Sequence, residues 1–207
     1  MLGIIGKKLG MTQVYNNEGL PIPVTVVEVL PATVLAVKTK DTDGYVAIKV
    51  ATGTKKEKHI SKPELGLFKK LGIAPAHWVQ EFRLKDVVGW EVGKQYDLSI
   101  FNDDKKVTVI ATSKGKGFAG TIKRHNFSRG PEAHGSKNTR APGSLGAHTF
   151  PGRVFPGKKL GGHMGVDHKT VKNLEIVKID LEKNLVFIKG AVPGGTNGKV
   201  IIRKQNG

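Results

Sequence analysis

The sequence predicts a mainly β protein, an antiparallel barrel interrupted by two excursions. Three observations support this class. Strand patterns fill residues 1–52 and return in 99–112 and 166–207, a helical pattern with several aromatic residues occupies 53–98, and a Gly-rich basic stretch occupies 113–165. Strands on both sides of two non-strand segments fit one sheet closed on itself. We therefore expect a barrel made of 1–52, 99–112 and 166–207.

The first segment carries three clear strand patterns. Residues 24–30 are a β-branched run between two prolines, and residues 34–39 and 45–51 flank Asp43-Gly44. An Asp-Gly pair between two strand patterns is typical of a hairpin. Apolar and other side chains alternate along 45–51, so this strand is expected to be half-buried.

The segment 53–98 is expected to be a small inserted subdomain with a short helix. Ser61 and Glu64 have capping-box spacing, Pro63 suits the first helical turn, and Gly72 is a natural stop. Apolar residues recur at helical spacing between them. The aromatic residues that follow are expected to pack inside the subdomain, because large aromatic side chains are mostly buried. They are Trp78, Phe82 and Trp90.

Strand patterns resume after the subdomain. In residues 106–111, Val107, Val109 and Ala111 alternate with Lys106, Thr108 and Ile110, and strand patterns recur in residues 174–180, 185–189 and 199–204 with turn residues between them. Alternation of this kind predicts antiparallel strands with one face on a core.

Composition limits the classes of protein. The chain has 207 residues, which allows one or two domains, and it has no Cys, which excludes disulfides and thiolate metal sites. No apolar run approaches the roughly 20 residues that span a bilayer. The N-terminal residues lack the pattern of a signal peptide. We expect a cytoplasmic protein, with no membrane partner and no homo-oligomer.

The net charge is +17, and +9 of it lies in 113–165, where Glu132 is the one acidic residue. This stretch contains 12 Gly and few large apolar residues, so burial of its own side chains cannot offset the entropy lost on ordering. A polyanionic partner supplies the missing free energy. A solvated linker is the alternative, but a linker needs neither the Phe residues nor the Arg and His side chains found here. A membrane-surface helix is disfavoured by the Gly and Pro content.

Other chemistry fits the stretch poorly. Residues 115–120 match GxGxxG after a strand, but no second strand ending in an acidic residue follows, so a dinucleotide site is rejected. The four His residues have spacings unlike those of metal ligands, and no Cys accompanies them. No catalytic motif is present. We therefore expect neither an enzyme, nor a metal site, nor a cofactor. Basic clusters spaced along an extended chain favour structured RNA over a groove of duplex DNA.

Several motifs resemble the bacterial form of the large-subunit ribosomal protein L3 family. They are GIIGKKLGMT at 3–12, PVTVV at 23–27, KDTDGY at 40–45, TSKGKGFAG at 112–120, PGSLG at 142–146, PGRV at 151–154, GKKLGGHMG at 157–165 and KGAVPG at 189–194. The matches follow the chain in order over nearly its whole length. His125 and Ala147 depart from the family, since many bacterial members have Trp at the first position and some have a methylated Gln at the second.

The resemblance implies a six-stranded barrel of the translation-protein type, with a small α/β insertion and a long irregular basic loop. It implies direct binding to large-subunit (23S-type) rRNA near its 3′ end, an early role in subunit assembly, and a loop directed toward the peptidyl transferase centre. The implied neighbours are ribosomal proteins L14 and L19. The alternative is a free-standing enzyme or chaperone that acts on nucleic acid and uses a barrel plus a basic arm.

Basic, histidine and aromatic side chains are the expected rRNA ligands, two of them near the N-terminus and the others in the loop 113–165. They are Lys7, Lys8, Lys114, Lys116, Lys123, Arg124, His125, Phe127, Arg129, His134, Lys137, Arg140, His148, Arg153, Lys158, Lys159 and His163.

Overall fold

The computed structural model describes residues 2–205. The chain forms two compact units. The first runs up to Thr112 and resumes at His168, and the second is Ser113–Asp167. Among the described residues, no helix is both long and apolar enough to cross a membrane.

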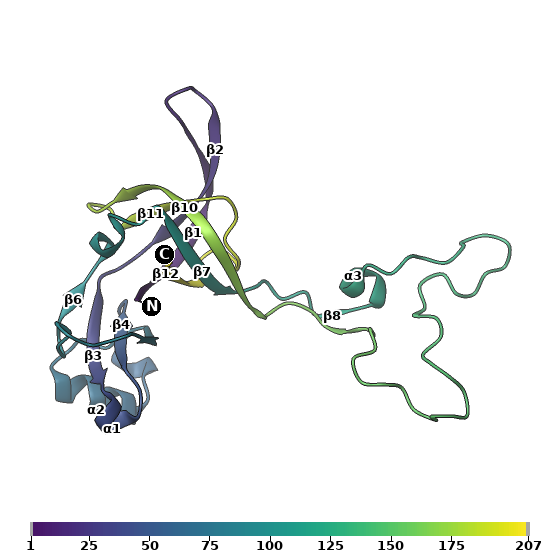
Figure 1. Cartoon of the computed structure of the whole chain (residues 1–207), viewed down its shortest axis with the longest axis horizontal. Coiled ribbons are helices and arrows are strands. Elements are labelled where there is room, and N and C mark those ends of the chain that lie inside the picture. Colours follow the sequence, from purple (N-terminus) through teal and green to yellow (C-terminus); the bar gives the residue numbers. More distant parts are fainter. Residues whose placement is uncertain (1, 206–207) are drawn as a thin grey trace. The chain divides into compact units, whose positions relative to one another are not determined.

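The first unit contains a closed antiparallel barrel, shown in Figure 1. Its strands are β1 (Gly3–Tyr15), β2 (Pro21–Glu28), β7 (Lys106–Thr112), β10 (His168–Asp180), β11 (Leu185–Lys189) and β12 (Lys199–Lys204). Around the barrel they are ordered β1, β12, β7, β10, β11 and β2, with β2 pairing back to β1. The prediction of a six-stranded antiparallel barrel is confirmed.

Alternating apolar residues form the strands and fill the barrel. Along β7, Val107, Val109 and Ala111 are buried while the residues between them are not, as the alternation predicts. On β1, Gly6 is fully enclosed, because a Cβ there would lie 2.6 Å from Val27 Cγ1 and 2.9 Å from the carbonyl oxygen of Glu28. The close approach of β1 and β2 therefore requires glycine at this position.

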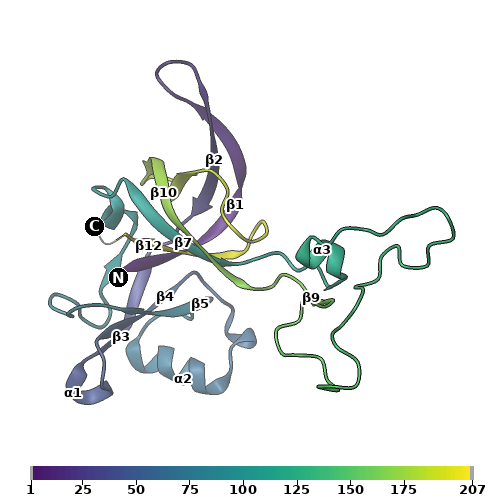
Figure 2. The ribbon, with the colours of Figure 1, turned by 45° about the vertical axis from the view of Figure 1, so that its right-hand side comes forward.

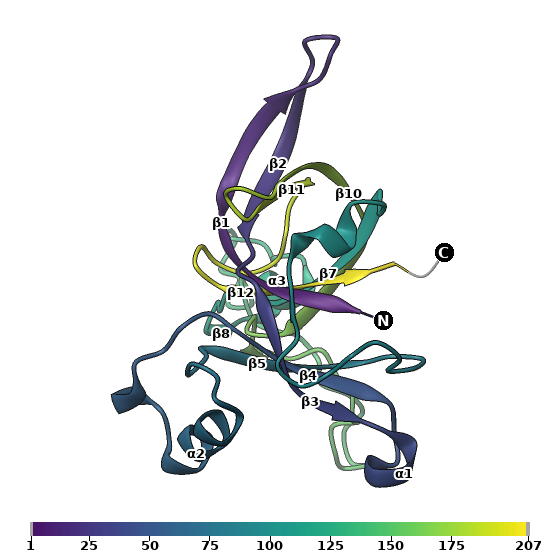
Figure 3. The same ribbon diagram turned by 90° about the vertical axis from the view of Figure 1, so that its left-hand side faces the viewer.

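The hairpin of β1 and β2 extends past the other strands of the barrel (Figure 3). Only Val24 to Glu28 of β2 pair with β11, so the outer part of the hairpin, before Val24 on β2, has no other strand beside it. Tyr15 and Leu20 are exposed on this outer part.

A second sheet has the order β5, β4, β3 and β6. Its strands are β3 (Ala32–Lys38), β4 (Ala47–Thr52), β5 (Trp78–Arg83) and β6 (Gln95–Tyr96). The expectation placed residues 32–52 in the barrel, whereas β3 and β4 pair with β5 and β6 of the inserted segment. The predicted hairpin is present, since β3 pairs with β4, and its connection is the short helix α1 (Lys40–Asp43), which ends at Gly44.

The second sheet shares one hydrophobic core with the barrel. Val34, Ile48 and Phe82 lie in the same cluster as barrel residues, and Trp78 and Trp90 pack against it. The aromatic residues were expected to pack inside the inserted subdomain, whereas they contact a core that the second sheet shares with the barrel. Tyr96 also belongs to this cluster, and its hydroxyl donates a hydrogen bond to the carbonyl oxygen of Gly3 at 2.9 Å. Burial raises the pKa of Tyr96 above its ordinary value.

Helix α2 (Lys62–Leu71) lies alongside β4 and β5 in Figure 2. Phe68 of this helix packs with Leu35 and Ala51 of the sheet. The expectation of a half-buried β4 was therefore wrong, because the helix covers its second face. The predicted helix limits are confirmed by the N-cap at Ser61 and the left-handed Gly72, although the hydroxyl of Ser61 bonds the carboxylate of Glu64 at 2.9 Å instead of a backbone N–H. Two short 3₁₀ helices complete the unit, η1 (Glu57–His59) and η2 (Leu98–Phe101).

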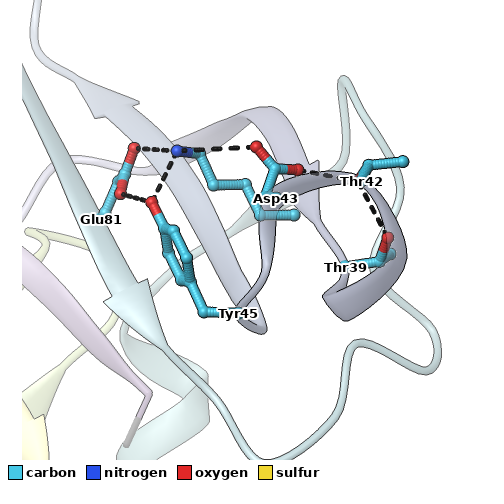
Figure 4. Close-up of polar contacts among 6 residues, drawn as sticks. Thr39, Thr42, Asp43, Tyr45 and Glu81 are labelled. Carbon is cyan, nitrogen blue, oxygen red and sulfur yellow. Dashed lines mark hydrogen bonds and ion pairs between the residues drawn. The ribbon is translucent and has the colours of Figure 1, made fainter.

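A polar cluster joins the outer ends of β3, β4 and β5, and Figure 4 shows Tyr45 pointing toward Glu81 within it. The ammonium of Lys38 lies 2.6 Å from the Tyr45 hydroxyl and 3.2 Å from a Glu81 oxygen, and the Tyr45 hydroxyl donates to Glu81 at 3.0 Å. These bonds, first from Tyr45 and then from Glu81, raise the pKa of Lys38. Partial burial acts to raise the pKa of Glu81, but the bonds from Lys38 and Tyr45 outweigh it and leave that pKa below its ordinary value.

We expect Glu81→Gln to lower the melting temperature at pH 7. A carboxyl group with a lowered pKa in the folded state stabilises that state at neutral pH, and the contribution is lost as pH falls through the folded-state pKa. The difference between the variant and the parent protein should therefore shrink as the pH falls below the ordinary pKa of a glutamate and through the lowered pKa of Glu81. Thermal unfolding across this pH range measures it, with the exposed Glu91→Gln as control. A difference that persists unchanged in acid would contradict the role given to the Glu81 charge.

Candidate nucleic-acid interface

The second unit begins with a short two-stranded protein segment, here called the stalk, which is made of residues 113–125 and 160–167. In it β8 (Phe118–Ala119) pairs with β9 (Gly162–His163), and helix α3 (Thr121–His125) follows β8. The N–H of Lys116 donates to the carbonyl of Met164 at 2.9 Å, and the N–H of Met164 donates to the carbonyl of Gly117 at 3.0 Å. The stalk is thus hydrogen-bonded across its two strands.

Gly165 is essential to the stalk geometry. It is buried at φ +83°, and a Cβ at this position would overlap the carbonyl oxygen of Lys114. No residue with a side chain fits this close approach of two backbones.

One backbone carbonyl joins α3 to the returning strand of the stalk. A guanidinium nitrogen of Arg124 donates to the carbonyl oxygen of Leu160 at 2.9 Å, and Nε2 of His125 lies 2.9 Å from the same oxygen. The His125 ring also lies beside Phe127, with ring centroids 6.2 Å apart. Arg124 and His125 were predicted as RNA ligands, and the structure adds a contact inside the loop for both.

Between the two halves of the stalk, residues 126–159 form an open loop without helix or strand. Its predicted ligands make only local contacts. Arg129 pairs with Glu132 at 2.7 Å, the Arg153 guanidinium lies over the Phe155 ring at 5.8 Å, and Nδ1 of His148 lies 2.9 Å from the Thr149 hydroxyl. Such contacts leave the cationic groups facing solvent.

Aromatic rings are exposed on this unit to an unusual degree. Phe118 is 81% exposed, Phe150 88% and Phe155 54%. Rings of this kind stack on unpaired bases, and base stacking combined with basic side chains is a common mode of RNA binding. These three rings were not among the predicted ligands, and Phe127, the aromatic residue that was, is half-buried. The basic and histidine ligands predicted in the loop are also exposed on the surface, namely Lys114, Lys116, Lys123, His134, Lys137, Arg140, Lys158, Lys159 and His163.

The two predicted ligands near the N-terminus belong to the barrel. The ammonium of Lys8 donates to the carbonyl oxygens of Val192 at 2.7 Å and Gly194 at 3.1 Å, so it ties down the turn before β12. Lys7 is partly buried and lines a cavity beside Trp78. RNA binding by Lys7 and Lys8 stays a prediction.

Sequence reasoning missed the residues that shape the stalk. Leu160 acts through its backbone carbonyl, which every residue has, so no signal marks it. Gly165 could have been noticed as the glycine that closes the basic stretch. Within residues 2–205, no group of three or more His, Asp or Glu side chains is arranged to hold a metal ion.

Comparison with known proteins identifies the family. The family described as "Ribosomal protein L3" matches residues 91–186. The large ribosomal subunit proteins uL3 of Vibrio cholerae serotype O1 and of Vibrio vulnificus are each 52% identical to this chain over 204 residues, covering 98% of both chains. The uL3 protein of Photobacterium profundum matches to the same extent. The chain therefore belongs to the ribosomal protein L3 family.

Proposed function

We propose that this protein is a structural constituent of the large ribosomal subunit and that its second unit binds large-subunit rRNA. The relatives that match nearly its whole length are large ribosomal subunit proteins. The observation that carries the RNA proposal is the loop itself, which has a charge of +9, exposed phenylalanines and no core of its own.

The finer parts of the proposal follow from family membership. The protein binds 23S-type rRNA near its 3′ end, acts early in subunit assembly, and directs the open loop toward the peptidyl transferase centre. Ribosomal proteins L14 and L19 are its neighbours, and the cytoplasm is its location. In this role residues 113–165 are the RNA-binding domain and the barrel supports that domain. Residues 53–98 are an inserted subdomain. The protein works by binding and positioning RNA, not as an enzyme.

Binding to large-subunit rRNA should weaken steeply with salt. Each phosphate that a lysine or arginine neutralises adds roughly 0.7–0.9 to the magnitude of the log–log slope. With ten Lys and Arg residues in 113–165, we expect a slope of several units. Filter binding of an rRNA transcript between low and moderate salt measures it.

Two outcomes would contradict this proposal. A nearly salt-independent affinity would rule out phosphate contacts as the basis of binding. A sucrose gradient of a cell lysate gives the second test. A structural component stays with the large subunit through a moderate-salt wash, so release of the protein by the wash would favour a free-standing enzyme or chaperone that acts on nucleic acid.

A further inference from the structure

A lysine-lined cleft lies at the junction of the barrel and the second sheet, within the first unit. It consists of two adjoining cavities of about 420 Å³ and about 260 Å³ that share His77 and Trp78 in their walls. The larger one is also lined by Lys49, Lys55 and Lys199, and the smaller one by Lys7. Four lysines thus surround one pair of aromatic rings.

The strand register brings two of these lysines face to face. Lys7 of β1 is directly opposite Lys199 of β12. Like charges at opposed positions of an antiparallel pair are destabilising. Lys199 is also partly buried, and this burial lowers the pKa of its ammonium. The free protein therefore bears an electrostatic cost at this point of the fold.

Carboxylates of the protein relieve this cost only in part, since Glu28 of β2 is directly opposite Lys7 on its other side. None of the ion pairs found among residues 2–205 involves Lys7, Lys55 or Lys199, and the ammonium of Lys199 donates to the side-chain oxygen of Gln80 at 3.1 Å. The acidic residues in the walls of the two cavities are Glu64 and Glu28, so lysines outnumber carboxylates. An external anion would lower the free energy of the cleft.

The aromatic pair indicates which kind of anion fits. The rings of His77 and Trp78 meet edge to face with centroids 4.7 Å apart. Trp78 packs on the core at one side yet still lines both cavities, so part of its indole faces the cleft. An aromatic surface beside cationic groups suits a planar base attached to a phosphate, whereas an acidic peptide needs only the cations.

We propose that this cleft binds one unstacked nucleotide of RNA, with its base against Trp78 and its phosphate among Lys7, Lys55 and Lys199. The proposal rests on the proposed function, because large-subunit rRNA is the RNA that would supply the nucleotide. It adds a second contact, on the body of the protein, to the contact made by the basic loop.

Tryptophan fluorescence of the full-length protein tests the proposal. The chain has two tryptophans, Trp78 and Trp90, and neither lies in the loop 113–165. Titration with a short single-stranded oligoribonucleotide should quench the emission in a saturable way, and Trp78→Phe should abolish the quenching. The melting temperature of this variant shows whether it folds. If it does not, ultraviolet cross-linking of a 4-thiouridine oligonucleotide to the unaltered protein should map to residues 77–79.

Charge variants test the phosphate part of the cleft. Lys7→Ala and Lys55→Ala should each weaken the affinity seen by quenching severalfold, because each removes a cation that neutralises the phosphate. Lys69→Ala on α2, outside the cleft lining, is the matched control and should stay within about twofold. Equal losses in all three variants would overturn the proposal.

Two further experiments distinguish a nucleotide site from a site for any polyanion and from binding by the loop. Polyphosphate and polyglutamate should compete with the oligonucleotide but should not quench Trp78. If the oligonucleotide also fails to quench, or polyglutamate quenches equally well, no nucleotide site exists here. A loop variant, Lys158→Ala with Lys159→Ala, should reduce retention of the rRNA transcript while Trp78 quenching persists, so failure of the loop proposal is distinguishable from failure of the cleft.

Discussion

Reversing the charge of Lys158 and Lys159 to Glu will reduce affinity for large-subunit rRNA on the order of 100-fold or more at low salt, since like charges brought together at an interface cost several kcal/mol. Both side chains are exposed on the returning arm of the open loop, just before Leu160 enters the stalk. In cells the variant should accumulate outside large subunits, which a sucrose gradient with detection of the protein measures.

Substitutions in the middle of the open loop provide the control. Residues 141–150 are all exposed and contain no Lys or Arg, so Ser144→Ala or Leu145→Ala should leave affinity and assembly largely intact. If the loop reaches the peptidyl transferase centre, we expect these variants to change the rate of peptidyl transfer. Middle-loop variants that block assembly as severely as the Lys158 and Lys159 reversal would refute this division of roles.

Phe82→Ala will destabilise the first unit by about 3–5 kcal/mol, the usual range for truncating a buried Phe. Phe82 is fully buried where the second sheet meets the barrel, and a Cβ on Gly3 of β1 would lie 2.7 Å from its ring. Because both sheets share this core, they should unfold in one transition. Chemical denaturation measures the loss, and Val88→Ala, at a position that is 86% exposed, should change little. Two separate transitions in the parent protein would show that the sheets are independent.

Elements with local signals could be predicted from the sequence. The ends of α2 follow from Ser61, Pro63 and Gly72, and the buried face of β7 follows from the alternation of Val107, Val109 and Ala111 with the residues between them. The sheet to which β3 and β4 belong could not be predicted. The partner of β3, β6, has only two residues, and both β6 and the partner of β4, β5, come after helix α2 in the chain, so the choice depends on tertiary packing that no local pattern records.

For the candidate site too, the sequence predicted the general character of the segment but not its detailed structure. Charge and glycine content indicated an irregular, basic, RNA-binding loop. They did not indicate the stalk, because its ladder has two residues on each side and its cross-link is a backbone carbonyl contacted from 35 and 36 residues away. The cleft around Trp78 was missed for the same reason, since its lysines come from β1, β4, the segment after β4, and β12.

The closure of the barrel has a consequence for how the protein is made. Strand β12 is the last described strand along the chain, and it fills the gap between β1 and β7, with Arg203 opposite Gly3. A growing chain therefore completes its basic loop while the barrel is still open, with unpaired edges on β1 and β7. Such edges favour pairing with other chains, and contacts between distant parts of a sequence form slowly. We therefore expect the nascent protein to be exposed to aggregation between synthesis of the loop and synthesis of β12. If the loop binds rRNA early, as proposed above, the rRNA would hold a protein whose barrel has yet to close.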